Sequence, residues 1–239
     1  MEYLFLFSRG YYMQRYFLDQ QNQFKSDDVH HILNVMRFKT GVQVEICKLE
    51  GCFLATLEIE NHSVRYKLIQ LLSDNPPLNI TIIQGLPKGD KIDLVTKYAT
   101  LFQAQGIIFM PMVRSIAKLS NIEHKLGRLN KIAKEAAELS KRSTLPEIQF
   151  IENLNTLDLT NKTLILLDEL ESSYTLKDLY DTKHTNEVYV IIGPEGGIDF
   201  KERQSFIDLG AKPLSLGQSI LPTELAHIPV LNAFLLKKV

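Results

Sequence analysis

From residue 79 to the end of the chain, short apolar runs alternate with helical segments. The apolar runs are nearly continuous, as expected of strands that are buried on both faces. This alternation predicts an α/β domain in which helices cover a mostly parallel sheet. The expected strands span 79–84, 106–110, 163–167, 187–192 and 213–216, and the expected helices span 88–103, 125–141, 175–180, 200–209 and a last one from about Pro222.

The first part of the chain has a different pattern. Short β-type runs at 15–18, 42–48, 53–59 and 64–71 predict a small β barrel. One helix, capped by Ser26 or Asp27 and ending near 37–40, interrupts these runs. The polar, proline-containing segment 73–77 is the expected linker. We therefore expect two domains, at 13–72 and 78–239, with Met13 as the natural start of the protein.

Composition excludes several classes of protein. The 239 residues are 45% hydrophobic and 23% charged, typical of a folded, water-soluble protein. No apolar run is long enough for a membrane span or a signal peptide, so we expect a cytoplasmic location. Cys47 and Cys52 match no zinc-binding spacing and are expected to be reduced thiols on a hairpin. The adjacent pair His30-His31 cannot share one ion from a helix, and we expect no metal site.

Three predicted strands run into chemically distinctive loops. The first ends in Asp168-Glu169, the second in Gly193-Pro194-Glu195-Gly196-Gly197, and the third leads through Gly217 to Thr223-Glu224. Ligands of open α/β sheets lie beyond the carboxyl ends of the strands, and glycines let a ligand contact the backbone. The glycine loop is neither a Walker loop nor a dinucleotide fingerprint. A simple tight turn, and carboxylates that only cap helices, remain alternatives.

A local excess of positive charge lies between Arg114 and Arg142. This segment holds eight Lys and Arg residues against three acidic residues, a net of +5, whereas the whole chain has a net charge of −1. Such a segment can neutralise RNA phosphates. The pairs Lys131/Glu135 and Lys134/Glu138 are equally typical of a solvated helix face. Both interpretations stay open on these residues alone.

Several motifs together resemble the RsmE-type 16S ribosomal RNA uracil-N3 methyltransferases of the SPOUT class, which use S-adenosylmethionine (AdoMet). The resemblance spans nearly the whole chain after Met13. It is carried by five motifs: His30 to Arg37 with Lys39 and Gly41, Pro87 to Lys91, Ala133 to Ala137 with Ser140, Arg142 and Pro146, Ile192 to Gly197, and Leu216 to Glu224.

The resemblance implies a PUA-like N-terminal barrel, a C-terminal α/β domain tied in a trefoil knot, and a homodimer acting on 16S rRNA or the small ribosomal subunit. It also implies an AdoMet site in the three loops. The expected cofactor-binding residues are Leu167, Gly193, Pro194, Glu195, Gly196, Gly197, Leu216, Gly217, Ile220 and Leu221.

The reaction at uracil N3 needs removal of a proton and stabilisation of the negative charge that develops on the ring oxygens. A carboxylate and a cation are therefore expected, and Glu224 and Arg142 are the candidates. An acid such as Glu224 is also stabilised at the start of a helix without any catalytic role. The candidate RNA contacts are Arg15, Arg37, Arg114, Arg128 and Lys131.

The sequence departs from the family pattern at defined positions. Pro222 stands where the family has an arginine, Leu139 where it has a glutamine, and Leu101-Phe102-Gln103 where it has Glu-Leu-Gly. These departures leave two alternatives to the uracil-N3 methyltransferase. One is an RNA-binding relative that acts in ribosome assembly without methylating. The other is a SPOUT methyltransferase for a different RNA base.

Overall fold

The computed structural model describes residues 13–182 and 186–238. The expected start at Met13 concerns residues 1–12, which lie outside the described residues. The chain divides into two compact units, Met1–Asn75 and Pro76–Val239, and the division falls within the segment 73–77. Each unit is described by itself.

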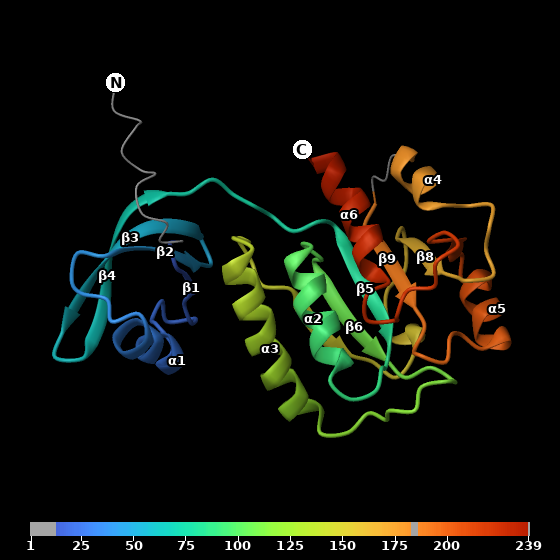
Figure 1. The fold of residues 1–239 in the computed structure, drawn as a ribbon, viewed down its shortest axis with the longest axis horizontal. Helices are drawn as coiled ribbons and strands as arrows, with labels where there is room; N and C mark the ends of the chain where they lie inside the picture. Colours follow the sequence, from blue (N-terminus) through green and yellow to red (C-terminus); the bar gives the residue numbers. More distant parts are fainter. Residues whose placement is uncertain (1–12, 183–185, 239) are drawn as a thin grey trace. The chain divides into compact units, whose positions relative to one another are not determined.

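The N-terminal unit contains a sheet of four strands in the order β1-β2-β3-β4 (Figure 1). The strands are β1 (Arg15–Phe17), β2 (Gln43–Lys48), β3 (Gly51–Glu60) and β4 (Ser63–Leu71). β2, β3 and β4 are antiparallel neighbours, whereas β1 pairs with β2 in parallel. All four strands were expected within three residues of these bounds. Among the described residues β1 and β4 do not pair with each other, so closure of this sheet into a barrel stays a prediction.

A short helix packs on the buried face of this sheet. Helix α1 (Ser26–His30) continues into a π-helical turn at His31–Val35. The expected cap at Ser26 or Asp27 is wrong, because Ser26 is already helical and Lys25 occupies the cap position without a side-chain hydrogen bond. The helical path ends before Arg37, whose φ of 53° is left-handed. Ile32 is fully buried, and Tyr16 Oη and His31 Nδ1 are 2.9 Å apart.

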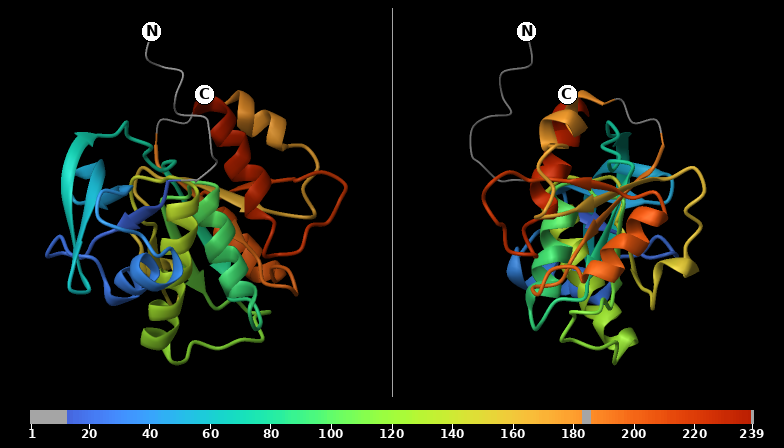
Figure 2. Two further views of the ribbon diagram at one scale, coloured as in Figure 1. Left: turned by 60° about the vertical axis from the view of Figure 1, so that its left-hand side comes forward. Right: turned by 90° about the vertical axis from the view of Figure 1, so that its right-hand side faces the viewer.

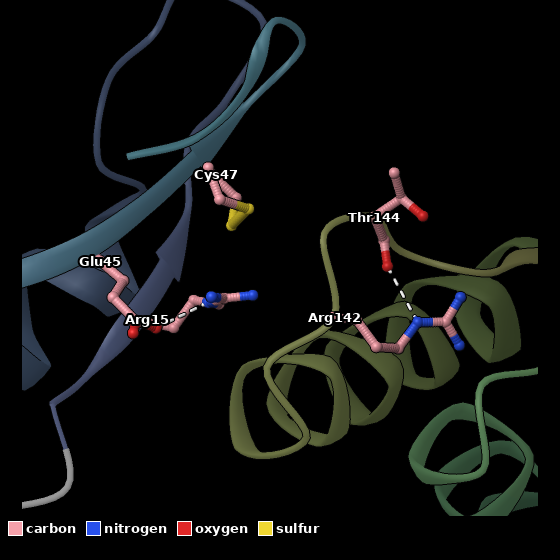
Figure 3. Close-up of a disulfide and its surroundings, with 6 residues drawn as sticks. Arg15, Glu45, Cys47, Arg142 and Thr144 are labelled. Carbon is pink, nitrogen blue, oxygen red and sulfur yellow. Dashed lines mark hydrogen bonds and ion pairs between the residues drawn. A yellow bond between two sulfur atoms is a disulfide. The ribbon is translucent and has the colours of Figure 1, made fainter. Parts of the chain in front are cut away.

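The expectation of two reduced thiols is wrong in this structure. Cys47 and Cys52 are direct partners across the β2–β3 hairpin, with their Cα atoms 4.0 Å apart, and a disulfide joins them (Figure 3). The hairpin register brings the two side chains to the same face of the sheet. Both cysteines are buried. The prediction assumed the reducing environment of the cytoplasm. It did not consider that Cys47 and Cys52 pair directly across the hairpin.

The C-terminal unit is built on one sheet of six strands, in the order β10-β8-β9-β5-β6-β7. Every neighbouring pair is parallel, as the alternation predicts. The strands are β5 (Ile80–Gly85), β6 (Gly106–Met110), β7 (Glu147–Phe150), β8 (Thr163–Leu167), β9 (Val188–Ile192) and β10 (Lys212–Leu214). β7 was not predicted, and β10 ends two residues earlier than expected.

Helices connect these strands in the expected order. They are α2 (Lys91–Leu101), α3 (Ile122–Leu139), α4 (Leu176–Asp181), α5 (Phe200–Asp208) and α6 (His227–Lys238), with a short 3-10 turn at Leu154–Thr156. The last helix begins at His227 and not at Pro222. The segment between them forms turns, with the Leu225 N–H donating to the Pro222 carbonyl at 2.9 Å. None of the described helices is long and apolar enough to cross a membrane.

Alternate residues of the four inner strands β8, β9, β5 and β6 supply two separate cores. Ile82 and Phe109 lie in the larger cluster with residues of α2, α3, α4 and α6, whereas Ile83 and Ile108 lie in the cluster with Phe206 of α5. This division follows from the alternation of side chains along a strand. Figure 2 shows α2 and α6 on one side of the sheet and α5 on the other. Burial on both faces explains the continuous apolar runs in the sequence.

His227 is an unusual buried polar residue, and its chain neighbour Ala226 belongs to the larger cluster. The His227 side chain is 0% exposed at the start of α6, and neither ring nitrogen has a hydrogen-bond partner among the described residues. Burial lowers the pKa of His227 from 6.5 to about 4. The folded protein therefore holds this imidazole in its neutral form at neutral pH.

This burial predicts a pH-dependent loss of stability. Below its ordinary pKa the unfolded chain protonates His227 and the folded chain does not, so stability is lost as the pH falls from 6.5 to about 4. The loss from this one group is about 3 kcal/mol. Denaturant unfolding at pH 7 and pH 4.5 should show a smaller pH effect in His227→Leu than in the wild type. His62→Gln, at an exposed position, is the control, and an equal pH effect in all three proteins would contradict the assignment.

Candidate functional site

The loops singled out by sequence follow neighbouring strands. β8 lies between β10 and β9, and β9 lies between β8 and β5. Because all these strands are parallel, the loops after them emerge at one edge of the sheet. The loop after β5 joins the same edge and carries Lys88 into α2. Four loops from distant parts of the sequence therefore meet beyond the carboxyl ends of the strands (Figure 1).

A buried polar side chain fixes two of these loops to each other. Gln84, at the end of β5, is fully buried, and its Nε2 lies 3.1 Å from the Gly193 carbonyl and 2.7 Å from Thr223 Oγ1. Thr223 Oγ1 in turn donates to the Gly193 carbonyl at 2.5 Å. The glycine loop and the turn before α6 are thus held together. Sequence reasoning missed Gln84, although a glutamine inside an apolar strand was a signal for it.

The glycines of the 193–197 loop serve two purposes. A Cβ on Gly193 would lie 2.7 Å from Ile198 Cγ1 and 3.1 Å from the Gly197 carbonyl carbon, so Gly193 is required by the folding of the loop itself. Gly197 has a φ of +70°, and its N–H donates to the Pro194 carbonyl at 2.9 Å. A Cβ on Gly197 would meet only two charged side-chain ends, at 3.6 and 3.8 Å. The loop therefore forms a tight turn, and Gly197 also borders a space lined by two charged side chains.

An ion-pair network links the glycine loop to Glu224. Lys91 Nζ lies 3.1 Å from Glu224 Oε2 and 3.5 Å from Glu195 Oε1. The Lys88 N–H also donates to Glu195 Oε1, at 2.9 Å. Contact with Glu224 raises the pKa of Lys91, against a smaller opposing effect of burial. Burial alone would raise the pKa of Glu195, but the Lys88 N–H and the charge of Lys91 together lower it.

The loop after β10 places its residues at the same edge. Gly217 has a φ of +103°, a Cβ there would meet nothing within 4 Å, and its N–H donates to Ser215 Oγ at 3.2 Å. Leu216 and Leu221 are half-buried, whereas Ile220 is 82% exposed. Leu167, at the end of β8, is buried. The structure therefore brings all the expected cofactor-binding residues to one edge of the sheet.

The two carboxylates after β8 have different environments. Asp168 accepts from Arg203 Nε at 2.6 Å and from the Leu170 N–H at 3.0 Å, so it is bound within the protein. Glu169 is exposed, and its Oε1 is the group that a Cβ on Gly197 would meet at 3.6 Å. Of the two acids, Glu169 is the one that faces the glycine loop.

The structure does not bring Arg142 to these loops. Arg142 is 0% exposed, and its guanidinium donates to the carbonyls of Thr100 and Ala104 at 3.1 and 2.8 Å. It also donates to the Thr144 carbonyl at 3.1 Å (Figure 3). Burial lowers its pKa to about 10. The geometry gives Arg142 a structural role, which corrects its expected place among the catalytic groups. A motif in the sequence does not distinguish a buried arginine from one that faces a substrate.

The candidate RNA contacts differ in exposure. Arg15 is buried, with its Nε 2.8 Å from Glu45 Oε2 (Figure 3). Arg37, in the N-terminal unit, and Lys131, on α3, are exposed. Arg128, on α3, forms an ion pair with Asp93 of α2. Arg114 is exposed in the loop after β6, and its Nη1 donates to the Gly196 carbonyl at 3.0 Å.

Comparison with known proteins places this geometry in a family. The RNA methyltransferase domain family matches residues 74–235. The ribosomal RNA small subunit methyltransferase E of Bacillus subtilis is 31% identical over 92% of this chain and 95% of its own length.

Solved structures share the fold. A ribosomal RNA small subunit methyltransferase E from Neisseria gonorrhoeae bound to S-adenosyl methionine is 24% identical, with a TM-score of 0.80 over 95% of this chain and 97% of that one. A putative methyltransferase from Legionella pneumophila, in complex with the cofactor SAM, is 24% identical, with a TM-score of 0.82 over 94% and 98% of the two chains. The chain therefore belongs to the RNA methyltransferase family, in the group of the ribosomal RNA small subunit methyltransferases E.

Proposed function

We propose that this protein transfers a methyl group from AdoMet to N3 of a uridine in 16S ribosomal RNA. The observation that carries the proposal is the meeting of the glycine loop with Glu224 at one edge of the sheet, through Lys91 and Thr223. This arrangement places a cradle for a ligand beside an acidic side chain that can take a proton. Membership of the methyltransferase family supports the same chemistry.

The residues at this edge fit AdoMet. The cofactor would lie between Leu167, the 193–197 loop and the loop from Leu216 to Leu221. Open space at Gly217 and the exposed side chain of Ile220 leave room for an apolar group such as adenine. When bound, AdoMet supplies a methyl group on a positively charged sulfur. Similar folds solved with this cofactor support the assignment.

The chain's own residues would prepare the uracil. Uracil N3 carries a proton near neutral pH and becomes nucleophilic only when that proton leaves. Glu224 is the candidate acceptor, and its side chain is only 15% exposed. Lys91 orients this carboxylate through a contact that also reaches Glu195 of the glycine loop. The cofactor loop and the proton acceptor are thereby fixed in one network.

Finer features are part of the same proposal. We infer a PUA-like barrel for the N-terminal unit, a trefoil knot in the C-terminal unit, a homodimer, and a cytoplasmic location with the small ribosomal subunit as partner. The four-stranded sheet with its packed helix is compatible with the first inference. The hydrogen bonds that tie Thr223 to Gly193 and Gln84 support a C-terminal segment held against the glycine loop.

Calorimetric titration of the full chain with AdoMet tests this function without any assumption about the RNA. Saturable binding of one cofactor per chain is the expected result. A folded protein that does not bind AdoMet would contradict the methyltransferase. It would favour the RNA-binding relative that acts in ribosome assembly.

Gly197→Val is expected to weaken AdoMet binding by about 10- to 100-fold, because a branched side chain overfills the space beside the loop at a cost of about 1–3 kcal/mol. The φ of +70° at Gly197 adds backbone strain. Gly210→Val is the matched control, since Gly210 has a φ of +92° and a Cβ there would meet nothing within 4 Å. Both variants should lose stability, but only Gly197→Val should lose affinity in calorimetry. Equal affinities in the two variants would remove Gly197 from the site.

A further inference from the structure

Two opposite charges from separate loops face each other across Gly197. Arg114 comes from the loop after β6 and Glu169 from the loop after β8, strands that β9 and β5 separate in the sheet. A Cβ on Gly197 would lie 3.6 Å from Glu169 Oε1 and 3.8 Å from Arg114 Nη1. Both side chains are exposed. The loops therefore bring a carboxylate and a guanidinium to the same point of the glycine loop.

Neither charge forms an ion pair among the described residues, although the charge of Arg114 also acts on Glu202. Among the described residues Glu169 makes no hydrogen bond or ion pair, and Arg114 makes one hydrogen bond, to the Gly196 carbonyl at 3.0 Å. They do not pair with each other. Neighbouring acids are engaged, since Asp168 binds Arg203 and Glu202 accepts from the Val113 N–H at 3.2 Å. The remaining donors of Arg114 and both oxygens of Glu169 are open to a ligand.

The chemistry of the pair selects among ligands. An RNA phosphate would be attracted by Arg114 but repelled by Glu169, and a neutral base needs neither charge. A zwitterion with a carboxylate and an ammonium on one carbon complements both side chains together. A guanidinium binds a carboxylate through two parallel hydrogen bonds, and a carboxylate accepts from an ammonium. The missing Cβ of Gly197 leaves the room that such a group requires.

We propose that Arg114 and Glu169 clamp the amino-acid end of the cofactor, with Arg114 holding its carboxylate and Glu169 its ammonium. This inference rests on the proposed function, because AdoMet is the ligand that carries such a group. It moves Arg114 from the expected RNA contacts to the cofactor site. It also gives Glu169 a binding role, where sequence alone left it as a solvated or helix-capping acid.

Two thioether analogues of AdoMet, one with and one without the amino-acid end, test the contribution of that end to binding. S-adenosylhomocysteine carries the amino-acid end, whereas methylthioadenosine has a methyl group in its place, and neither carries a charge on sulfur. Calorimetry on the full wild-type chain should give tighter binding of S-adenosylhomocysteine. Arg114→Met and Glu169→Gln should each weaken its binding by about 10- to 100-fold, as expected for the loss of one charged hydrogen-bonding partner, and leave methylthioadenosine within about twofold.

A third ligand separates the two roles. Decarboxylated S-adenosylhomocysteine retains the ammonium and lacks the carboxylate. Its affinity should fall in Glu169→Gln and stay unchanged in Arg114→Met. Lys118→Met, in the same loop as Arg114, and Glu152→Gln are controls for the loss of an exposed charge, and they should bind all three ligands like the wild type.

The outcomes distinguish the clamp from the function on which it rests. If the wild type binds none of the ligands, the proposed function fails, and the clamp fails with it. If the wild type binds both thioethers equally, or the variants weaken both equally, the clamp is overturned while the cofactor site stands. Weaker RNA binding by Arg114→Met with unchanged affinity for S-adenosylhomocysteine would return Arg114 to the RNA contacts.

Discussion

Arg142→Met is expected to lower the free energy of unfolding by about 2–5 kcal/mol, because each buried carbonyl that loses its hydrogen-bond donor costs about 1–3 kcal/mol. The guanidinium is fully buried and donates to three backbone carbonyls, at Thr100, Ala104 and Thr144. Methionine fills part of the volume but donates no hydrogen bond, so buried carbonyls lose their partner. The Thr100 and Ala104 carbonyls lie at the end of α2 and before β6, and the substitution should loosen that junction.

Denaturant unfolding of the variant measures this effect directly. Lys131→Met is the control, because Lys131 is an exposed cation on α3. The control should unfold at nearly the denaturant concentration of the wild type. A catalytic Arg142 would behave differently, since its replacement would reduce turnover and leave stability nearly intact. Wild-type stability in Arg142→Met would therefore contradict the structural role.

Glu224→Gln is expected to slow methylation by about 100- to 10,000-fold, the usual contribution of a positioned general base. Glutamine keeps the shape of the side chain but cannot take the N3 proton at neutral pH. AdoMet affinity should stay close to that of the wild type, because the 193–197 loop keeps its hydrogen bonds to Gln84 and Thr223. Single-turnover methylation of rRNA, together with calorimetry, separates these two quantities.

Glu195→Gln is the matched control for this substitution. Glu195 shares Lys91 with Glu224, but it lies in the glycine loop and accepts from the Lys88 N–H. Glutamine retains an acceptor for that N–H. A much smaller loss of rate is expected than in Glu224→Gln. Wild-type turnover in Glu224→Gln would leave Glu224 as a residue that only stabilises the turn before α6.

The fold was most predictable where burial dominates the pattern. The bounds of β6 and β8 are confirmed, because their apolar runs are continuous and end at polar residues or turns. β7 was missed because Glu147-Ile148-Gln149-Phe150 is short, half polar and at the edge of the sheet. The start of α6 was misplaced because Pro222 is a common first helical residue, whereas hydrogen bonds with Gln84 and the Gly193 carbonyl hold Thr223 in a turn.

The sequence was sufficient to predict which loops form the site, but it was not sufficient to predict the side-chain contacts between them. The parallel sheet alone indicates which strand ends converge, and the glycine loop was found in this way. Contacts such as those of Lys91 with Glu195 and Glu224 join residues more than a hundred positions apart, and no local pattern encodes them. Burial is equally invisible to a motif, which is why Arg142 was placed among the catalytic groups. The hairpin register likewise places Cys47 and Cys52 opposite each other, a pairing that the sequence analysis did not consider.

Methylation of a uridine at N3 is best tested by identifying the nucleoside that the protein methylates. Small ribosomal subunits and 16S rRNA from cells without this protein would be incubated with the purified chain and AdoMet, digested to nucleosides and examined by mass spectrometry. We expect 3-methyluridine with the wild type and almost none with Glu224→Gln. A methyl group on another nucleoside, or no methylation by a protein that binds AdoMet, would contradict the proposed reaction.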